Sequence, residues 1–182
     1  LEVVEQLFDR MLAAFDKLKA QGWQQAFDPS EAADGEVKVM LSIEGSEVFA
    51  RGLHLVEEYR RKGVRMAAVT WNHVNALATP HCVDATTGLT PFGLDAVKEM
   101  QRQKIAVDIS HLNIQGVEDI MNKTNVPPMA SHSCCRALRE HSRNLTDDQL
   151  RDLFAAGGFV GLNFYPKFLT DGPCTLDTLV DH

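Results

Sequence analysis

The sequence lacks an excess of basic residues and any long apolar run. Its 182 residues contain 18 Lys and Arg against 25 Asp and Glu, for a net charge of -7. Phosphate binding requires clustered basic side chains, so this composition argues against a nucleic-acid partner. A membrane-spanning helix requires about 20 consecutive apolar residues, and a signal peptide has a basic segment followed by an apolar one. Neither pattern occurs, and we expect no transmembrane segment in these residues.

Cysteine is also scarce, and its spacing is uninformative. The four cysteines are Cys82, Cys134, Cys135 and Cys174, and none forms a C-x-x-C pair. An adjacent pair such as Cys134-Cys135 is a poor basis for a disulfide framework. These features favour a reducing compartment and with it a cytoplasmic location, which the sequence does not establish.

What the sequence does contain is a regular alternation of strand-like and helix-like segments. Strands are expected at 36–45, 64–71, 105–111, 127–133 and 159–165, and helices at 1–20, 46–63, 89–104, 114–123 and 146–158. Thr90 before Pro91 predicts a helix start, and Thr146 with Gln149 forms a capping-box pattern. We expect residues 1–182 to form a single domain. The chain opens within one helix and closes on another just begun, so we expect it to be a piece of something longer.

Alternating apolar strands and helices are typical of an α/β protein with a parallel sheet. No G-x-G-x-x-G or Walker A sequence occurs, which weakens a nucleotide-binding hypothesis. An open doubly wound sheet and a (β/α)8 TIM barrel both fit. Polar residues at the strand ends favour the barrel, whose active sites lie at that face. These residues are Glu44, His73, His111, His132, Asn163 and Tyr165. The chain would cover about five central strands of the barrel.

Imidazole and carboxylate groups from neighbouring strands suit a metal such as zinc. A single histidine after a strand is usually an ordinary loop residue, and spacing alone leaves a structural role open as well. Asp108 precedes His111 by three residues and is expected to support a ligand or the fold rather than bind metal. The other histidines are expected to be solvated or packing residues. They are His54, His81, His141 and His182.

Five segments resemble the membrane (renal) dipeptidase family of zinc hydrolases. In order they read SIEG, VTWNHVNALA, GLTPFGLDAVKEMQRQKIAVDISH, PPMASHSCCRALREHSRNLTDDQL and GGFVGLNFY. The resemblance runs from about Glu36 to the C-terminus. It implies a TIM barrel of the metal-dependent hydrolase type holding two zinc ions.

The resemblance also implies roles for individual residues. Glu44 would bridge both zinc ions, and His111 and His132 would bind the second. His73 would contact the substrate and stabilise the developing oxyanion. Arg143 would hold the carboxylate of the substrate. The two Ser-His endings, at 110–111 and 131–132, would then supply paired ligands from adjacent strands.

The implied activity is hydrolysis of dipeptides with a free C-terminal carboxylate by a metal-bridging hydroxide. The substrate would be a small dipeptide, and a homodimer is compatible with the resemblance. The family's H-x-D and D-x-D-G motifs do not occur. We therefore expect truncation, and a 182-residue piece that is inactive alone. Two alternatives remain: another amidohydrolase-type enzyme acting on a lactone, ester or cyclic amide, or a non-catalytic metal-binding fragment or pseudo-enzyme.

Overall fold

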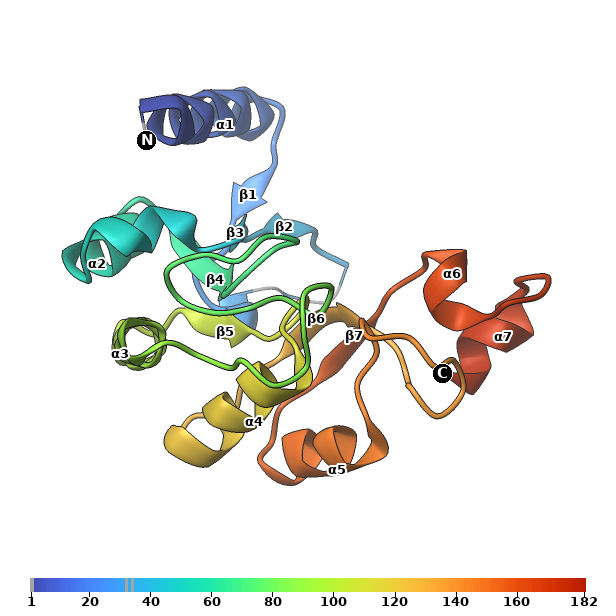
Figure 1. Cartoon of the computed structure of the whole chain (residues 1–182). Coiled ribbons are helices and arrows are strands. Elements are labelled where there is room, and N and C mark those ends of the chain that lie inside the picture. The colour runs from blue at the N-terminus through green and yellow to red at the C-terminus, as the bar shows by residue number, and fades with distance from the viewer. Residues whose placement is uncertain (1, 32, 34) are drawn as a thin grey trace.

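The computed structural model describes residues 2–31, 33 and 35–182, and Figure 1 shows its course. Leu1, where the first predicted helix began, lies outside the described residues. In chain order the elements are α1 (Glu2–Ala20), β1 (Gln24–Gln25), η1 (Pro29–Glu31), β2 (Lys38–Val39), β3 (Leu41–Glu44), η2 (Glu47–Arg51), α2 (His54–Arg61), β4 (Val64–Ala68), α3 (Pro91–Arg102), β5 (Ala106–Asp108), α4 (Ile114–Lys123), β6 (Ala130–Ser133), α5 (Asp147–Ala155), β7 (Val160–Leu162), α6 (Pro166–Leu169) and α7 (Leu176–Asp181).

The strands β3 to β7 lie side by side in chain order and are parallel. β4 pairs with β3 and β5, and β6 pairs with β7. A parallel bridge between Asp108 and Met129 connects the two groups, and the amide of Ile109 donates to the Met129 carbonyl at 2.8 Å. Parallel neighbours require crossover connections, which helices supply here. The predicted α/β class is confirmed. Within the described residues, β3 and β7 at the two ends of the series are not paired with each other.

The helices α2 to α5 form an arc around one side of the strands (Figure 1). Each of these helices contacts the next. The core between helices and strands includes Phe49, Val56, Val64 and Ile120, none of which is exposed to solvent. α1 joins this core through Phe8, whose ring meets Tyr59 edge-on at 4.8 Å. None of the helices in the described part of the chain is long and apolar enough to cross a membrane.

The predicted helix starts are confirmed where a side-chain cap was recognised. The Thr90 hydroxyl accepts from the amide of Gly93 at 2.8 Å, with Pro91 as the first residue of α3. At α5, Thr146 and Gln149 form both hydrogen bonds of the capping box. These contacts satisfy amides that the first turn of a helix leaves without partners.

Two predicted elements are each divided in the structure. The strand expected at 36–45 becomes β2 and β3, separated by Met40. The helix expected at 46–63 becomes η2 and α2, with Gly52 between them at φ 146°. Residues with a side chain rarely adopt that φ, so glycine at this position ends one helix and reorients the chain before the next.

β5 ends earlier than predicted, at Asp108 rather than at His111. The Asp108 carboxylate accepts from the amide of Ser110 at 2.9 Å. An aspartate bonded to the amide two residues on is an Asx-turn, which takes the chain out of extended conformation. His111 follows with φ 73°, in the left-handed region. His111 therefore lies on a turn beyond the strand end.

Candidate metal centre

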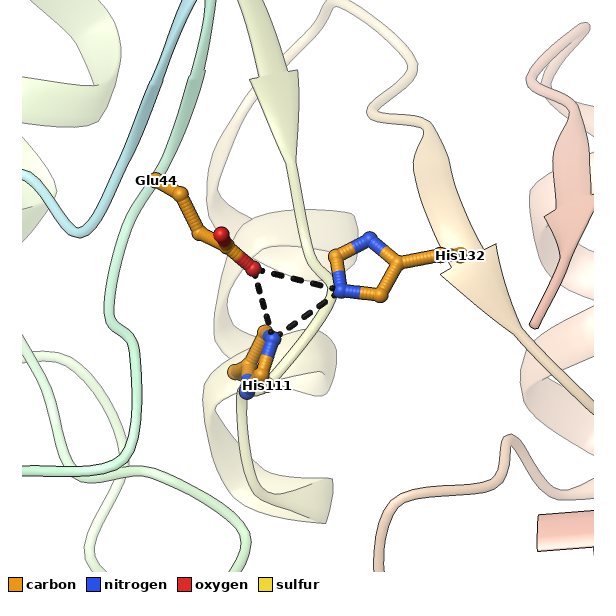
Figure 2. Close-up of side chains that lie close together, drawn as sticks. All are labelled: Glu44, His111 and His132. Atoms are coloured by element: carbon orange, nitrogen blue, oxygen red, sulfur yellow. Dashed lines mark hydrogen bonds and ion pairs between the residues drawn. The ribbon is translucent and has the colours of Figure 1, made fainter. Parts of the chain in front are cut away.

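Three of the predicted site residues meet at one point, as Figure 2 shows. Glu44 is the last residue of β3, His111 follows β5, and His132 lies in β6. The Nε2 atom of His111 lies 3.1 Å from Oε1 of Glu44 and 3.0 Å from Nε2 of His132. The third distance, from His132 Nε2 to Glu44 Oε1, is 3.3 Å. Strands distant in sequence thus deliver three potential ligand atoms to one point.

The Nδ1 atom of each imidazole is engaged by a neighbouring side chain. His111 Nδ1 lies 3.0 Å from Oδ1 of Asn72, an acceptor, so this nitrogen carries the proton. His132 Nδ1 lies 2.6 Å from the Ser131 hydroxyl. Ser131 also contacts the carboxylate of Asp108, which is buried and is not one of the three clustered groups.

Burial keeps both imidazoles neutral. The pKa of His111 falls from 6.5 to about 3, chiefly because burial disfavours its charged form and secondarily because Arg143 carries a positive charge. The pKa of His132 is lowered by burial and by Arg143, while Asp108 and Glu44 act in the opposite direction. Ion pairs with Glu44 would require protonated rings, which burial opposes.

This donor set fits a cation. With Nδ1 of His111 bonded to an acceptor and its ring neutral, Nε2 of His111 presents a lone pair toward Glu44 Oε1 and Nε2 of His132. Zinc binds imidazole nitrogen at about 2.0–2.1 Å in tetrahedral geometry, which places adjacent ligand atoms about 3.3 Å apart. The observed separations of 3.0, 3.1 and 3.3 Å are close to that value. The residues present therefore fit one metal ion.

Arg143 is buried, with only 3% of its surface exposed. Its Nη1 atom donates to the Ser133 hydroxyl at 3.0 Å. Its Nε and Nη2 atoms have no hydrogen-bond partner among the described residues. Burial lowers its pKa from 12.5 to about 10, with Asp108 and Glu44 opposing the shift, so the group stays charged at neutral pH. A buried cation with two donors unpaired among the described residues has donors available for an anion.

His73 does not join the cluster. It lies on the loop that follows β4 and its side chain is exposed. The ring of Trp71 stands near both sites, 6.1 Å from the ring of His73 and 6.5 Å from that of His111. The structure thus separates His73 from the three grouped residues. Asn163 and Tyr165 also stay outside the cluster, and the amide of Tyr165 donates to the Asn163 side chain at 2.8 Å.

Sequence reasoning missed residues that support the cluster. His81 was predicted to be solvated or packing, yet its ring lies 6.2 Å from that of His111. Its amide donates to the carbonyl of His111 at 2.8 Å, which helps to hold the left-handed conformation there. Asn72, whose side chain contacts Nδ1 of His111, was not among the predicted site residues.

The family model described as membrane dipeptidase (peptidase family M19) matches residues 4–182. The chain belongs to the membrane dipeptidase family. The resemblance seen in the sequence is thereby confirmed.

Curated relatives are about one-third identical to the chain over the residues that align. An uncharacterized dipeptidase of Schizosaccharomyces pombe is 32% identical over 158 residues, 82% of this chain and 38% of that protein. Dipeptidase aclJ of Aspergillus oryzae is 33% identical over 136 residues, 74% of this chain and 32% of that protein. The chain therefore spans between about a third and about three-fifths of the length of the curated relatives it matches.

Solved structures show the same fold. A metallo peptidase from Rhodobacter sphaeroides, liganded with a phosphinate mimic of the dipeptide L-Ala-D-Ala, superposes with a TM-score of 0.85 at 26% identity. It covers 96% of this chain, which spans 54% of that protein. An amidohydrolase from Pseudomonas aeruginosa gives a TM-score of 0.84 at 25% identity, covering 93% of this chain and 54% of its own length.

Proposed function

We propose that the protein containing this chain is a zinc-dependent dipeptidase acting on dipeptides with a free C-terminal carboxylate. The observation that carries the proposal is the convergence of Glu44 Oε1 with the Nε2 atoms of His111 and His132. Membership of the membrane dipeptidase family and relatives named dipeptidase support the same reaction class. The fold proposed for the whole protein is a closed (β/α)8 barrel with this cluster at its mouth.

Glu44, His111 and His132 would hold one zinc ion. The Glu44 side chain is 53% exposed, and its contacts within the cluster use Oε1. Its Oε2 atom is therefore available to bridge to a second ion, as a carboxylate with two oxygens can. When bound, zinc supplies a water activated near neutral pH and an electrophile for the peptide carbonyl.

Arg143 would recognise the free carboxylate of the substrate. Its unpartnered Nε and Nη2 atoms form one edge of the guanidinium group, which matches the two oxygens of a carboxylate. Because Arg143 is already buried and desolvated, binding removes little further hydration from it. A substrate lacking the charge would leave these donors unsatisfied.

His73 would act on the peptide carbonyl of the substrate. His73 lies exposed on the loop after β4, and its ring centroid is 6.1 Å from that of Trp71. A neutral imidazole can donate a hydrogen bond to a carbonyl oxygen that gains negative charge. His73 would therefore serve the reaction without holding metal.

The test uses the complete protein, stripped of metal with a chelator and then given zinc. Hydrolysis of a dipeptide should return with zinc, and the same dipeptide with an amidated C-terminus should react poorly. Equal rates on an ester or lactone without a carboxylate would favour another amidohydrolase-type activity. Zinc binding without turnover of any of these substrates would instead indicate a non-catalytic metal-binding protein.

A further inference from the structure

The two Ser-His elements, 110–111 and 131–132, look alike in sequence but differ in their contacts. We propose that Ser131 is a positioning residue that fixes the tautomer of His132. Its hydroxyl donates to the buried carboxylate of Asp108 and accepts from the ring of His132, and this chain of two hydrogen bonds is called the relay below. The inference deepens the proposed function, and it rests on that function for the role of His132 as a zinc ligand.

The relay begins at Asp108, which is 2% exposed at the end of β5. Its Oδ1 atom accepts from the amides of Ser110 and Ser131, both at 2.9 Å. Its Oδ2 atom accepts from the hydroxyl of Ser131. A carboxylate has no hydrogen to donate, so these contacts direct the only hydroxyl hydrogen of Ser131 toward Asp108.

The next contact fixes the ring. Ser131 Oγ lies 2.6 Å from His132 Nδ1, and its hydrogen is already used. The oxygen must therefore accept from an N–H at Nδ1. A neutral imidazole then keeps Nε2 unprotonated, and this is the nitrogen that faces Glu44 and His111 (Figure 2). The ring thus presents a lone pair at the position where a metal ion would sit.

The other serine makes no comparable contact. The Ser110 hydroxyl accepts from the backbone amide of His132 at 3.1 Å and lies 3.4 Å from the Ser131 hydroxyl. His111, which follows Ser110, is instead oriented by Asn72. Ser110 therefore supports backbone position, and Ser131 alone of the two acts on a ring nitrogen.

The relay can be tested on the metal-free complete protein by long-range ¹⁵N–¹H NMR of the His132 ring. The wild type should carry its proton on Nδ1. In Asp108→Asn, the side-chain amide would donate to Ser131, whose hydroxyl would then donate to His132 Nδ1. The tautomer should reverse to Nε2–H, in the way a neutral amide misorients a histidine partner. Ser131→Ala should lose the preference for Nδ1–H.

A second arm measures zinc affinity by competition with a chelator. Loss of a hydrogen-bond partner of a metal-binding histidine typically weakens metal affinity 10- to 100-fold. We therefore expect Ser131→Ala to weaken zinc affinity by about this factor. Ser131→Thr, which keeps the hydroxyl, should recover most of it. Ser110→Ala is the matched control, the same truncation beside the other histidine, and should stay within about threefold of wild type.

Four outcomes distinguish the proposed role of Ser131 from its alternatives. A wild-type ring protonated on Nε2 overturns the proposal without any variant, as does an unchanged Nδ1–H tautomer in both Asp108→Asn and Ser131→Ala. Equal loss of zinc in Ser131→Ala and Ser110→Ala would reduce Ser131 to a packing residue. If the tautomers behave as expected but the wild type binds no zinc, the relay stands and the proposed function fails.

Discussion

The Nε2 atoms of His111 and His132 lie 3.0 Å apart, while Nδ1 of each ring is held by a separate side chain. Burial keeps both rings neutral, and with the Nδ1–H tautomer on each ring, as inferred above for His132, their Nε2 lone pairs face each other and the carboxylate of Glu44. Such an arrangement is unfavourable without a positive charge at its centre. A cation bound at the centre would remove this repulsion between the lone pairs and the carboxylate.

In the complete protein, elemental analysis should find about two zinc ions per chain, as a bridged pair of metals requires. His132→Ala removes one of few ligands to one ion, so zinc content should fall to about one. His54→Ala, at an exposed position on α2, is the control and should retain both. Unchanged zinc in His132→Ala, with the fold intact, would contradict the assignment of His132.

Arg143→Met should slow hydrolysis of a free-acid dipeptide. A charge-assisted contact is worth about 1.5–3 kcal/mol, which is roughly ten- to a hundred-fold in kcat/KM. Arg143→Lys should retain only part of the wild-type kcat/KM, since lysine lacks the planar guanidinium that binds both carboxylate oxygens. Zinc content should not change. Equal slowing of the free-acid and amidated dipeptides would show that Arg143 does not bind the carboxylate.

The same substitution should leave stability unchanged or raise it. Arg143 carries a buried charge whose Nε and Nη2 atoms have no partner among the described residues. Replacing a poorly paired buried charge by an apolar side chain of similar length is often neutral or stabilising. Thermal unfolding of the substrate-free protein measures this. A clear loss of stability would mean that the guanidinium supports the fold rather than a ligand.

Acid should destabilise the metal-free protein. The pKa of His111 is about 3 in the folded chain against 6.5 as its ordinary value. As the pH falls, the unfolded chain takes up a proton on His111 before the folded chain does. The contribution of neutral His111 to the free energy of unfolding is therefore complete above pH 6.5 and is lost as pH falls toward about 3. His81, whose pKa burial lowers to about 4, acts in the same direction.

Urea unfolding at several pH values between 7 and 4, with chelator present, measures this dependence. As the pH is lowered, the free energy of unfolding should decrease less steeply in His111→Asn than in the wild type. His81 should account for part of the pH dependence that remains in this variant. His54→Asn, an exposed histidine, should keep the wild-type slope. Identical slopes for His111→Asn and the wild type would contradict a buried, neutral His111.

Gly161→Ala should be destabilising because β7 passes very close to β6 at this point. A Cβ atom on Gly161 would lie 2.3 Å from the carbonyl oxygen of Ser131, which cannot move without displacing the strand. We expect a loss of about 1–3 kcal/mol. Gly172→Ala, where the nearest atom to an added Cβ lies 3.7 Å away, is the control. Comparable stability of the two variants would show that β6 can shift freely.

The sequence predicted those elements whose signals are contained within a few residues. Thr90 with Pro91 and Thr146 with Gln149 identified the starts of α3 and α5 because a cap bonds an amide three residues away. The alternation of apolar segments predicted the α/β class for the same reason, since periodicity is local. The motifs around Glu44, His111 and His132 also pointed to the correct family.

Only the tertiary structure decided which of the strand-end residues meet. His73 follows a strand as His111 does, yet one is exposed on a loop and the other lies in the cluster. The sequence also did not predict the burial of Arg143, nor the contact of Ser131 with both Asp108 and His132. A side chain's partners and its desolvation depend on atoms brought in by other strands, and these through-space relations have no fixed spacing along the chain.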